Sequence, residues 1–302
     1  MAAETVTSTE VVNTAVTTAA GAPRRRRGAR RRRVRTALNY LVLSLTAAVV
    51  LAPIYVTVVF SLQSGTDVLQ FPRSLFPTSI DTSVFQRVFE VSAIGRYLLN
   101  SAIVSIAITI GQVLTSILAG YVFSELNFRG RNLVFLAFLA TLMVPAEVTI
   151  VANYDVISWL GWLNSYQGLV VPFLATAFGT FLMRQAFMGI PRDLRDAARL
   201  DGYGHMGFLW GVAVPLARPS IAALSVFSFL LAWNQYLWPL LITDSDEYRT
   251  VQIGLRSLAS TNITQLNLVF AGTVIASIPI FVLLILFQKQ LIRGLTSGAV
   301  KG

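Results

Sequence analysis

The chain has 302 residues, of which 55% are hydrophobic and only 13% are charged, and its mean hydropathy is +0.65. A soluble domain usually carries about 25% charged residues, so most of this protein's surface is expected to face lipid. The chain has no cysteine and one histidine, which excludes disulfides, thiolate catalysis and metal clusters built from Cys or His. We therefore expect one membrane domain, with no catalytic residue and no metal site.

The net charge of +10 comes almost entirely from one short segment, residues 24–35, which holds nine arginines. Such a run can bind nucleic acid, but no nucleic-acid-binding module accompanies it, so we interpret it as a solvated segment held against anionic lipid. Residues 1–23 contain no aromatic residue and cannot bury a core. We therefore predict that residues 1–35 form a disordered basic tail in the cytoplasm, which contacts membrane lipid and no nucleic acid.

Six apolar stretches are long enough to cross a membrane. A membrane helix needs about 20 apolar residues, since each adds about 1.5 Å across a hydrocarbon core of about 30 Å. The first stretch has no charge from Thr36 to Thr66, which is too long for a signal peptide, so we expect it to be retained as a span. The expected spans are residues 38–60, 97–123, 132–152, 168–189, 217–242 and 267–291.

Lys and Arg in the loops set the expected orientation of the chain. With the N-terminus in the cytoplasm, the cytoplasmic side receives 19 of these residues, nine of them from the basic tail, and the outer side receives five. Both termini are therefore expected in the cytoplasm, and residues 61–96, 153–167 and 243–266 are expected outside. Within the first of these loops, Asp81–Tyr97 is expected to form a short interfacial helix.

One short charged segment, residues 196–215, lies between the fourth and fifth expected spans and has the sequence DAARLDGYGHMGFLWGVAVP. Pro191 suits a helix start, and Asp193 and Asp196 fall in the first turns, where the helix dipole favours acidic residues. Gly202 permits a backbone turn that a residue with a Cβ would resist. We therefore expect a short helix that ends in a turn at this glycine.

The two sides of the expected turn carry different apolar side chains. Before the turn, Leu194, Ala197 and Ala198 recur at helical spacing on one face, and the paired alanines let another surface approach closely. After the turn, a bulkier apolar surface precedes Pro215, which is expected to start the fifth span; this surface consists of Met206, Phe208, Leu209 and Trp210. An ordinary interfacial loop between two spans is the alternative interpretation.

The spacing of this segment resembles the EAA-x3-G-x9-I-x-LP loop of the membrane-spanning subunits of binding-protein-dependent ABC importers. Three positions depart from that pattern, with Asp196 in place of Glu, Val212 in place of Ile and Val214 in place of Leu. The resemblance implies a type I importer permease fold, in which residues 190–216 form two short cytoplasmic helices in a cleft of a separate ATPase. The residues that it assigns to this coupling are Asp196, Ala197, Ala198, Asp201, Gly202 and Pro215.

Four further stretches extend the resemblance over residues 36–302. They are LMVPAEVTI, GTFLMRQAF, WNQYLWPLLIT and GLTSGAVKG, which begin at Leu142, Gly179, Trp233 and Gly294. Together they look most similar to the permease subunits of glycerol-3-phosphate and glycerophosphodiester importers.

That family implies a six-helix permease domain over residues 36–302, in the bacterial plasma membrane. It also implies a second permease as heterodimer partner, two ATP-binding subunits and an extracytoplasmic substrate-binding protein. The chain contains no G-x-x-x-x-G-K-[ST] motif, so ATP and magnesium are expected in the partner ATPase. This chain itself is expected to bind no cofactor and to be no enzyme.

Polar residues inside the spans are candidates for the substrate pathway, because burying them in lipid is unfavourable. Asn234 and Gln235 can hydrogen-bond the hydroxyls of a polyol, and Tyr236 and Trp238 can stack on its carbon backbone. Packing against the partner permease is the competing explanation for this cluster. Further candidates near the outer ends of the spans are Glu147, Asn153 and Tyr154.

Two charged residues within the spans have a simpler interpretation. Glu147 would repel a phosphate, so a structural or gating role is preferred for it. Arg184 could attract a phosphate, but it lies about two turns from the cytoplasmic end of its span. Both side chains can reach water at a membrane interface.

Three other functions are compared with import of glycerol-3-phosphate. The same class of transporter could carry a sugar such as a disaccharide, since the binding protein does most of the selecting. A stand-alone secondary transporter would be favoured by inverted repeats, which the sequence does not show. An intramembrane enzyme would need catalytic acids, a nucleophile–base pair or metal ligands inside the spans, and the sequence offers little of this kind.

Overall fold

The computed structural model describes residues 24–69, 71, 74–77, 79–261 and 265–296. These residues form helices and connecting turns, with no β-strand among them, so the predicted all-α class is confirmed for the described part of the chain. In chain order the elements are α1 (Arg24–Leu62), α2 (Gly65–Leu69), α3 (Ser83–Val91), α4 (Ile94–Glu125), α5 (Arg131–Ala140), η1 (Thr141–Met143), α6 (Ala146–Trp159), α7 (Tyr166–Val170), η2 (Val171–Phe173), α8 (Ala177–Met188), α9 (Arg192–Leu200), α10 (His205–Phe208), η3 (Leu209–Ala213), α11 (Val214–Leu216), α12 (Arg218–Trp233), α13 (Leu237–Ile242), α14 (Val251–Thr261) and α15 (Leu266–Thr296). The elements η1 and η2 are 3-10 helices, and η3 is a π-helix.

The chain divides into two compact units, residues 1–54 and 55–302, with the boundary inside α1. In the first unit, the described residues are the N-terminal part of α1. This helix begins at Arg24 and so takes in residues 24–35, which the sequence analysis assigns to a disordered tail. Arginine has a high helix propensity, which suits a helical run. The prediction for residues 1–23 lies outside the described residues.

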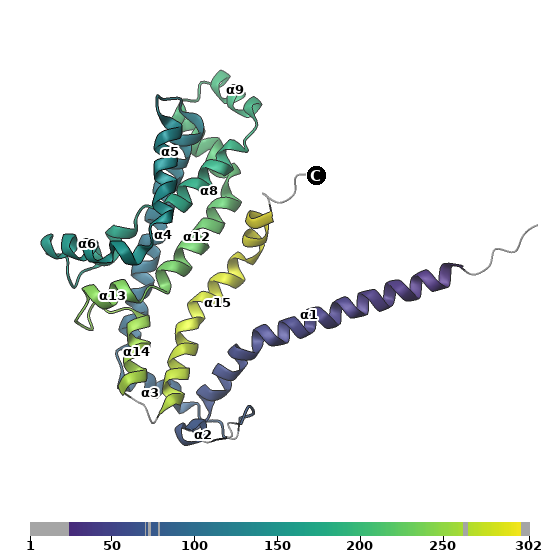
Figure 1. The fold of residues 1–302 in the computed structure, drawn as a ribbon, viewed down its shortest axis with the longest axis vertical. Coiled ribbons are helices and arrows are strands. Elements are labelled where there is room, and N and C mark those ends of the chain that lie inside the picture. Colours follow the sequence, from purple (N-terminus) through teal and green to yellow (C-terminus); the bar gives the residue numbers. More distant parts are fainter. Residues whose placement is uncertain (1–23, 70, 72–73, 78, 262–264, 297–302) are drawn as a thin grey trace, which may run out of the picture. The chain divides into compact units, whose positions relative to one another are not determined.

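The second unit is built around α4. The helices α8 and α12 pack against α4, and α15 packs against α12 (Figure 1). Because α4 is surrounded in this way, it contributes buried side chains to three of the hydrophobic clusters, at successive heights along its length. These side chains are Ile94 and Tyr97 near its start, Val104 and Ile108 in its middle, and Ile117 and Tyr121 near its end.

Close contact between α4 and α8 depends on Gly120. A Cβ at this position would lie 2.7 Å from the Cβ of Met183 and 2.8 Å from the backbone nitrogen of Arg184. No side chain fits at these distances, so glycine allows the two helix backbones to approach. The contact lies in the C-terminal halves of both helices. It holds together the part of α4 and α8 against which the following residues, 190–216, pack.

The third expected span, residues 132–152, is not one helix. The parts Arg131–Met143 and Glu147–Trp159 are bent by 100° relative to each other. Val144 between them is extended, with ψ of 116°, because the ring of Pro145 disfavours helical backbone in the residue before it. The third expected span is therefore a bent pair of helices rather than one straight helix.

The fourth and fifth expected spans are broken as well. In the fourth, Tyr166–Phe173 and Ala177–Met188 are bent by 47° relative to each other, and Pro172 lies in the 3-10 helix that ends the first part. In the fifth, residues 217–242, α12 ends at Trp233 and α13 begins at Leu237. Pro239 lacks the N–H that a continuous helix would use to bond the carbonyl of residue 235, and its ring clashes with that carbonyl.

Three described helices are long and apolar enough to cross a membrane alone: Arg32–Leu62, Ile94–Glu125 and Leu266–Gln290. Three bent pairs meet the same criterion when each pair is taken as one span, which allows up to six. One of these pairs joins His205–Leu216 to Arg218–Trp233, and so includes residues that the sequence places in a cytoplasmic loop. The six-span count therefore stays a prediction.

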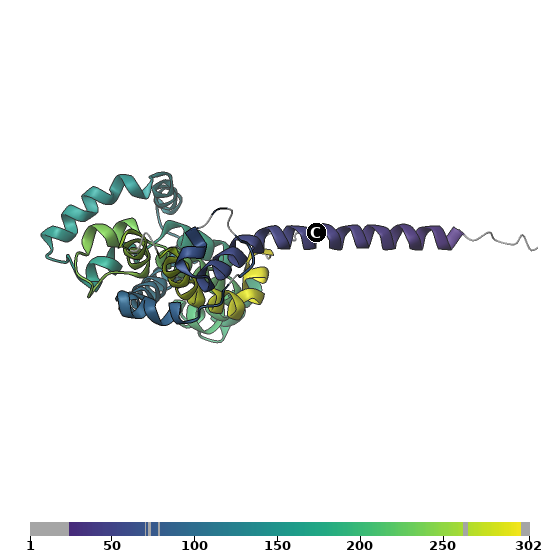
Figure 2. The same cartoon turned by 90° about the horizontal axis from the view of Figure 1, so that it is seen from below.

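The second unit presents α9 at one end and α3 and α14 at the opposite end (Figure 1). Both views place α6 at the periphery (Figure 1, Figure 2). The helix expected within Asp81–Tyr97 is present as α3, whereas α14 lies in a stretch for which the sequence analysis expects only a loop.

Candidate functional site

Residues 190–216, termed the α9–α11 segment, contain a helix that is closed by a Schellman motif at Gly202. This glycine has φ of +82°, a conformation that it adopts without the steric conflict of a Cβ. The N–H of Tyr203 donates to the carbonyl of Ala198 at 2.9 Å, and the N–H of Gly202 donates to the carbonyl of Arg199 at 3.0 Å. These two bonds define the motif and satisfy carbonyls that the helix end would leave unpaired. The turn predicted at Gly202 is thus confirmed.

After the turn, the chain passes through α10, η3 and α11. Pro215 lacks an N–H and cannot donate to the carbonyl of Gly211, four residues earlier, and the wider π-helix η3 lies where that bond is missing. Pro215 is expected to start the fifth span. It lies instead in the short helix α11, and the long helix α12 begins after it, at Arg218.

An inward face of the α9–α11 segment packs against α4 and α8. Ala198, Phe208 and Leu209 are almost fully buried there, in one cluster with Tyr121 of α4 and Phe187 of α8. The expectation that Ala198, Phe208 and Leu209 present themselves to another surface is therefore wrong, because this chain covers them. The burial of Ala198 instead fixes the position of α9.

An outward face of the same segment carries large apolar side chains that are exposed. Leu200 is 90% exposed and Met206 is 63% exposed, one on each side of the Gly202 turn. Large apolar side chains that are exposed in this way suit a surface for another macromolecule. The other large exposed side chains of the segment are Leu194, Tyr203 and Trp210. The smaller candidates that are exposed beside them are Asp196, Ala197 and Asp201.

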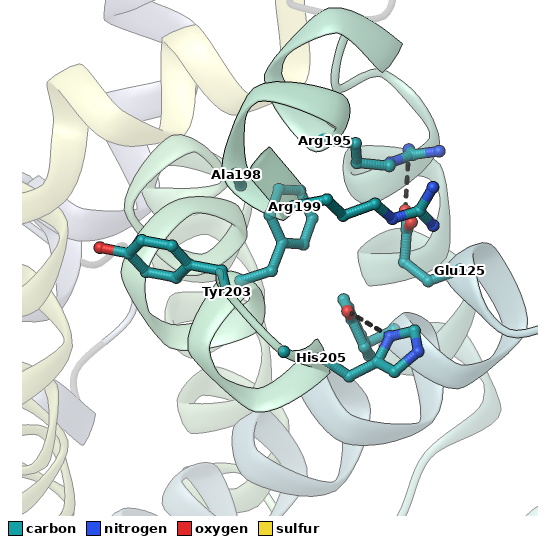
Figure 3. Close-up of a pocket in the computed structure, with 9 residues that line it drawn as sticks. Glu125, Arg195, Ala198, Arg199, Tyr203 and His205 are labelled. Atoms are coloured by element: carbon teal, nitrogen blue, oxygen red, sulfur yellow. Dashed lines mark hydrogen bonds and ion pairs between the residues drawn. The ribbon is translucent and has the colours of Figure 1, made fainter. Parts of the chain in front are cut away.

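A pocket of about 100 Å³ lies between this segment and the end of α4 (Figure 3). In it, Oε1 of Glu125 lies 2.8 Å from Nη2 of Arg195, and the two side chains are 6% and 21% exposed. The hydroxyl of Tyr121 lies 3.2 Å from Nδ1 of His205. Arg199 lines the same pocket. One ion pair and one hydrogen bond thus connect the segment to α4.

Glu125, Arg195 and Tyr121 are not among the residues that the sequence indicates for a functional site. Glu125 and Arg195 are far apart along the chain, and nothing in the spacing of either residue indicates its partner. One signal was available, since Glu125 directly follows a long uncharged apolar stretch, where a lone carboxylate needs a partner if it is buried.

The polar cluster predicted for the substrate pathway forms the break between α12 and α13. Trp238 is 5% exposed, and its indole N–H donates to the carbonyl of Gly168 at 3.0 Å, so this side chain belongs to the core. Asn234 donates from Nδ2 to the carbonyl of Leu230 at 2.8 Å, at the end of its own helix. Both residues are therefore used by the fold.

The other two members of that cluster have free polar groups. The side chain of Tyr236 is 38% exposed. The side-chain oxygen of Gln235 is buried and has no hydrogen-bond partner among the residues that the structure describes. The exposed phenol of Tyr236 is thus the group of this cluster that a solute can reach, while the buried oxygen of Gln235 is left without a partner in this part of the structure.

The remaining pathway candidates lie on α6. Glu147 and Asn153 are exposed, and Glu147 is in the first turn of the helix, after the Pro145 break. Tyr154 packs against the same cluster as Trp238, so the structure brings these two candidates together. The coupling candidates form a separate group on α9–α11, at one end of the bundle (Figure 1).

Arg184 is engaged within the chain. Its Nε donates to the carbonyl of Phe123 at 3.2 Å, and its guanidinium lies 4.3 Å from the ring centre of Phe135. The side chain thus fastens α8 to α4 and α5 through a hydrogen bond and a cation–π contact.

Sequence comparison places the chain among transport proteins. A family model described as "Binding-protein-dependent transport system inner membrane component" matches residues 112–297. The chain is 38% identical over 270 residues to the sn-glycerol-3-phosphate transport system permease protein UgpE of Yersinia pestis bv. Antiqua, covering 86% of this chain and 95% of the relative. It is 36% identical over 274 residues to UgpE of Brucella abortus, covering 87% and 97% of the two chains.

Solved structures agree with this placement. A chain from a bacterial ABC transporter involved in the import of the acidic polysaccharide alginate matches with a TM-score of 0.74 and 25% identity, over 85% of this chain and 96% of that chain. A chain from the bacterial alginate ABC transporter in complex with its pentasaccharide-bound periplasmic protein matches with a TM-score of 0.57 and 13% identity, which supports the fold alone.

Proposed function

The chain belongs to the family of binding-protein-dependent transport system inner membrane components, and we propose that it forms half of the translocation pathway of an ATP-driven importer for glycerol-3-phosphate or glycerophosphodiesters. As a member of this family it is a multi-pass membrane protein and a transport subunit, not an enzyme. The substrate class is supported by the two UgpE relatives, because each is matched over almost its whole length.

The α9–α11 segment is the observation that carries the proposal. Its inward face is fixed by Ala198, Phe208 and Leu209, and its outward face exposes Leu200 and Met206 on both sides of a rigid turn. A surface that is apolar, exposed and backed by a packed core suits docking to a partner protein. We assign this surface to the partner ATPase, so that Asp196, Ala197, Asp201 and Gly202 lie at or beside the contact.

The complete importer comprises this chain, a second permease, two ATP-binding subunits that hold ATP and magnesium, and an extracytoplasmic substrate-binding protein. We propose six spans, with both termini and the α9–α11 segment in the cytoplasm. The asymmetry of 19 cytoplasmic against five outer Lys and Arg residues supports this orientation.

Single cysteines test the orientation in this cysteine-free chain. Ile80→Cys and Leu200→Cys form a matched pair, because both native side chains are highly exposed, at 73% and 90%. A membrane-impermeant thiol reagent added outside intact cells is expected to label position 80 and to leave position 200 unlabelled. The reverse pattern would overturn the proposed topology.

A sugar importer is the second candidate, and the alginate transporter favours it. That structure shares the fold at 25% identity, and its substrate is an acidic polysaccharide. Pathway groups such as the Tyr236 ring and the Gln235 amide suit any polyol, so they do not distinguish the two substrates.

Reconstitution distinguishes the candidates. The chain is co-expressed with its partner permease and ATP-binding subunits, and the complex is placed in proteoliposomes with ATP inside and the binding protein outside. Uptake of radiolabelled glycerol-3-phosphate or a glycerophosphodiester, without uptake of a disaccharide or an alginate oligosaccharide, is the expected result. Uptake of the sugars alone would show that the substrate is a sugar and not a glycerol phosphate compound. Failure of any ATP-binding subunit to co-purify would refute the importer assignment.

A further inference from the structure

The last turn of α4 contacts the α9–α11 segment at two points, on either side of the Gly202 turn (Figure 3). Glu125 pairs with Arg195 of α9 at 2.8 Å, and Tyr121 meets His205 of α10 at 3.2 Å. Residues four apart lie on one face of a helix, so both contacts come from the same face of α4. One turn of α4 therefore contacts the α9–α11 segment both before and after the Gly202 turn.

The ion pair between Glu125 and Arg195 is the stronger of the contacts made by charged groups on α9. Its side chains are 6% and 21% exposed, and Nη2 of Arg195 also donates to the carbonyl of Phe187 at 3.4 Å. The pair formed by Arg199 and Asp196 is 3.6 Å long and more than two-thirds exposed on both sides, so water screens it. A buried charge that loses its partner is strongly disfavoured, so the Glu125–Arg195 pair resists separation.

The other end of α4 is held to a loop by hydrogen bonds. The hydroxyl of Tyr97 donates to Oδ1 of Asp246 at 2.6 Å. Nδ2 of Asn100 donates to the carbonyls of Glu247 and Arg249, at 2.8 Å and 2.9 Å. Between its two ends α4 is one unbroken helix, with a length of about 48 Å at 1.5 Å per residue. A displacement of its C-terminal turn is therefore carried to the loop at its N-terminal end.

We propose that Glu125 and Arg195 are positioning residues that transmit the movement of α9 to α4, so that the α9–α11 segment and the loop Asp244–Arg249 move as one body during transport. The proposal deepens the proposed function and rests on it, because the partner ATPase imposes the movement. Besides its covalent connections, α9 meets α8 through the bond from Arg195 to the carbonyl of Phe187, and Ala198 packs in one cluster with residues of α4 and α8. The ion pair adds a charged contact with α4, which packs against both α8 and α12.

The order of the two charges provides a sharp test. Glu125 is the last residue of α4, and Arg195 lies at the end of the first turn of α9. Helix dipoles favour cations at C-terminal ends and anions at N-terminal ends, so both charges oppose the dipole of their own helix. The reversed pair, Glu125→Arg with Arg195→Glu, keeps the mutual attraction and removes both conflicts. The reversed variant is therefore expected to transport, although each of its single substitutions reverses one charge and creates repulsion.

The experiment compares uptake, ATP hydrolysis and subunit assembly in the same proteoliposomes. Glu125→Gln and Arg195→Gln are expected to assemble and to hydrolyse ATP, while the amount of glycerol-3-phosphate taken up per ATP falls about tenfold, within the range of usual coupling between sites. The reversed variant is expected to restore this ratio toward the wild-type value. Arg87→Gln is the matched control, since it removes one partner of a partly exposed ion pair with Asp81, which lies outside both the α9–α11 segment and the loop Asp244–Arg249, and it is expected to leave the ratio unchanged.

Two results would overturn the proposal. One is a wild-type ratio of uptake to ATP hydrolysis in both glutamine variants, and the other is a reversed variant that is assembled but no better than the single variants. If the reversed variant does not assemble, the double variant Glu125→Gln/Arg195→Gln decides. A loss no larger than that of either single variant supports the pair, because residues that act through one contact are not additive, whereas an additive loss refutes it.

A distance measurement separates this proposal from the proposed function. Spin labels on Arg129→Cys and Arg192→Cys, two exposed positions, report the separation of α9 from the end of α4 without any substrate. A narrow distribution that is broadened by Glu125→Gln supports the positioning role, and an unchanged distribution contradicts it. The absence of uptake by the wild-type complex, by contrast, refutes the substrate assignment and leaves the label distances interpretable.

Discussion

The α9–α11 segment and the break at Asn234–Trp238 are both interruptions of helices, yet they use their side chains in opposite ways. At the first, the backbone completes its own hydrogen bonds around Gly202, and large side chains such as Leu200 are left exposed. At the second, Trp238 and Asn234 donate to backbone carbonyls and are drawn into the fold. The second interruption also makes backbone bonds, from the N–H groups of Asn234 and Gln235 to the carbonyls of Leu230 and Ala232. The contrast therefore lies in the side chains: large apolar ones stay exposed beside Gly202, whereas those of Asn234 and Trp238 donate to carbonyls of this chain.

The largest loss in the free energy of unfolding is expected at Trp238, if side chains hold the break at Asn234–Trp238 together. Trp238→Ala removes a buried indole that packs against Phe173 with ring centres 5.9 Å apart, and such truncations cost about 3–5 kcal/mol. Trp238→Phe keeps most of the ring and leaves the carbonyl of Gly168 without its donor, at a cost of about 1–3 kcal/mol. Unfolding of the purified chain in mixed micelles by titration with a denaturing detergent measures both values.

If Trp238 contacted the solute, its variants would change transport rather than stability. In that case, Trp238→Phe would change the apparent affinity for substrate while the free energy of unfolding stayed at its wild-type value. The two variants thus separate a structural tryptophan from one that contacts solute.

A smaller loss of stability is expected in the α9–α11 segment, where backbone hydrogen bonds close the turn at Gly202. Gly202→Val places a β-branched side chain at φ of +82°, a strained conformation that costs about 1–3 kcal/mol. We expect the spans to stay inserted while ATP-binding subunits dissociate or hydrolyse ATP without uptake. Subunit retention on an affinity column and uptake in proteoliposomes measure the two outcomes.

Neighbouring variants control for this strain. Gly204 has φ of −76°, and a Cβ there would meet nothing within 4 Å, so Gly204→Ala is expected to behave as wild type. Gly202→Asn is expected to be milder than Gly202→Val, because asparagine tolerates the left-handed conformation. Equal behaviour of all three variants would show that the turn at Gly202 does not determine docking.

The sequence predicts those parts of the molecule in which one local signal decides the structure. Helices α4 and α15 lie within a few residues of the expected spans 97–123 and 267–291, because their apolar runs are long. The conformation of Gly202 follows from its place directly after a helix end, where a glycine adopts positive φ without the steric conflict of a Cβ. The prolines that break the third to fifth spans were visible, but hydropathy alone does not show whether a proline bends a helix or ends it.

The candidate site could be predicted only in part, because burial depends on the packing of distant segments. Ala197 and Ala198 are adjacent and chemically identical, yet the first is exposed and the second is buried against α4 and α8. The partnership of Glu125 with Arg195 arises from the same packing. A sequence that identifies the segment therefore does not identify which of its faces is free.

The smallest effect is expected where the second interruption leaves a side chain unused. The Tyr236 ring is partly exposed, so Tyr236→Phe removes a hydroxyl that is available to solute, whereas Asn234→Ala removes a bond of 2.8 Å to Leu230 within its own helix. Either loss costs about 0.5–1.5 kcal/mol, but on different quantities. We expect Tyr236→Phe to raise the substrate concentration at half-maximal uptake and to leave unfolding unchanged. We expect Asn234→Ala to lower the free energy of unfolding and to leave that concentration unchanged. If Asn234→Ala alone changed the uptake kinetics, the helix-end asparagine would contact solute, and the contrast between the two interruptions would not hold.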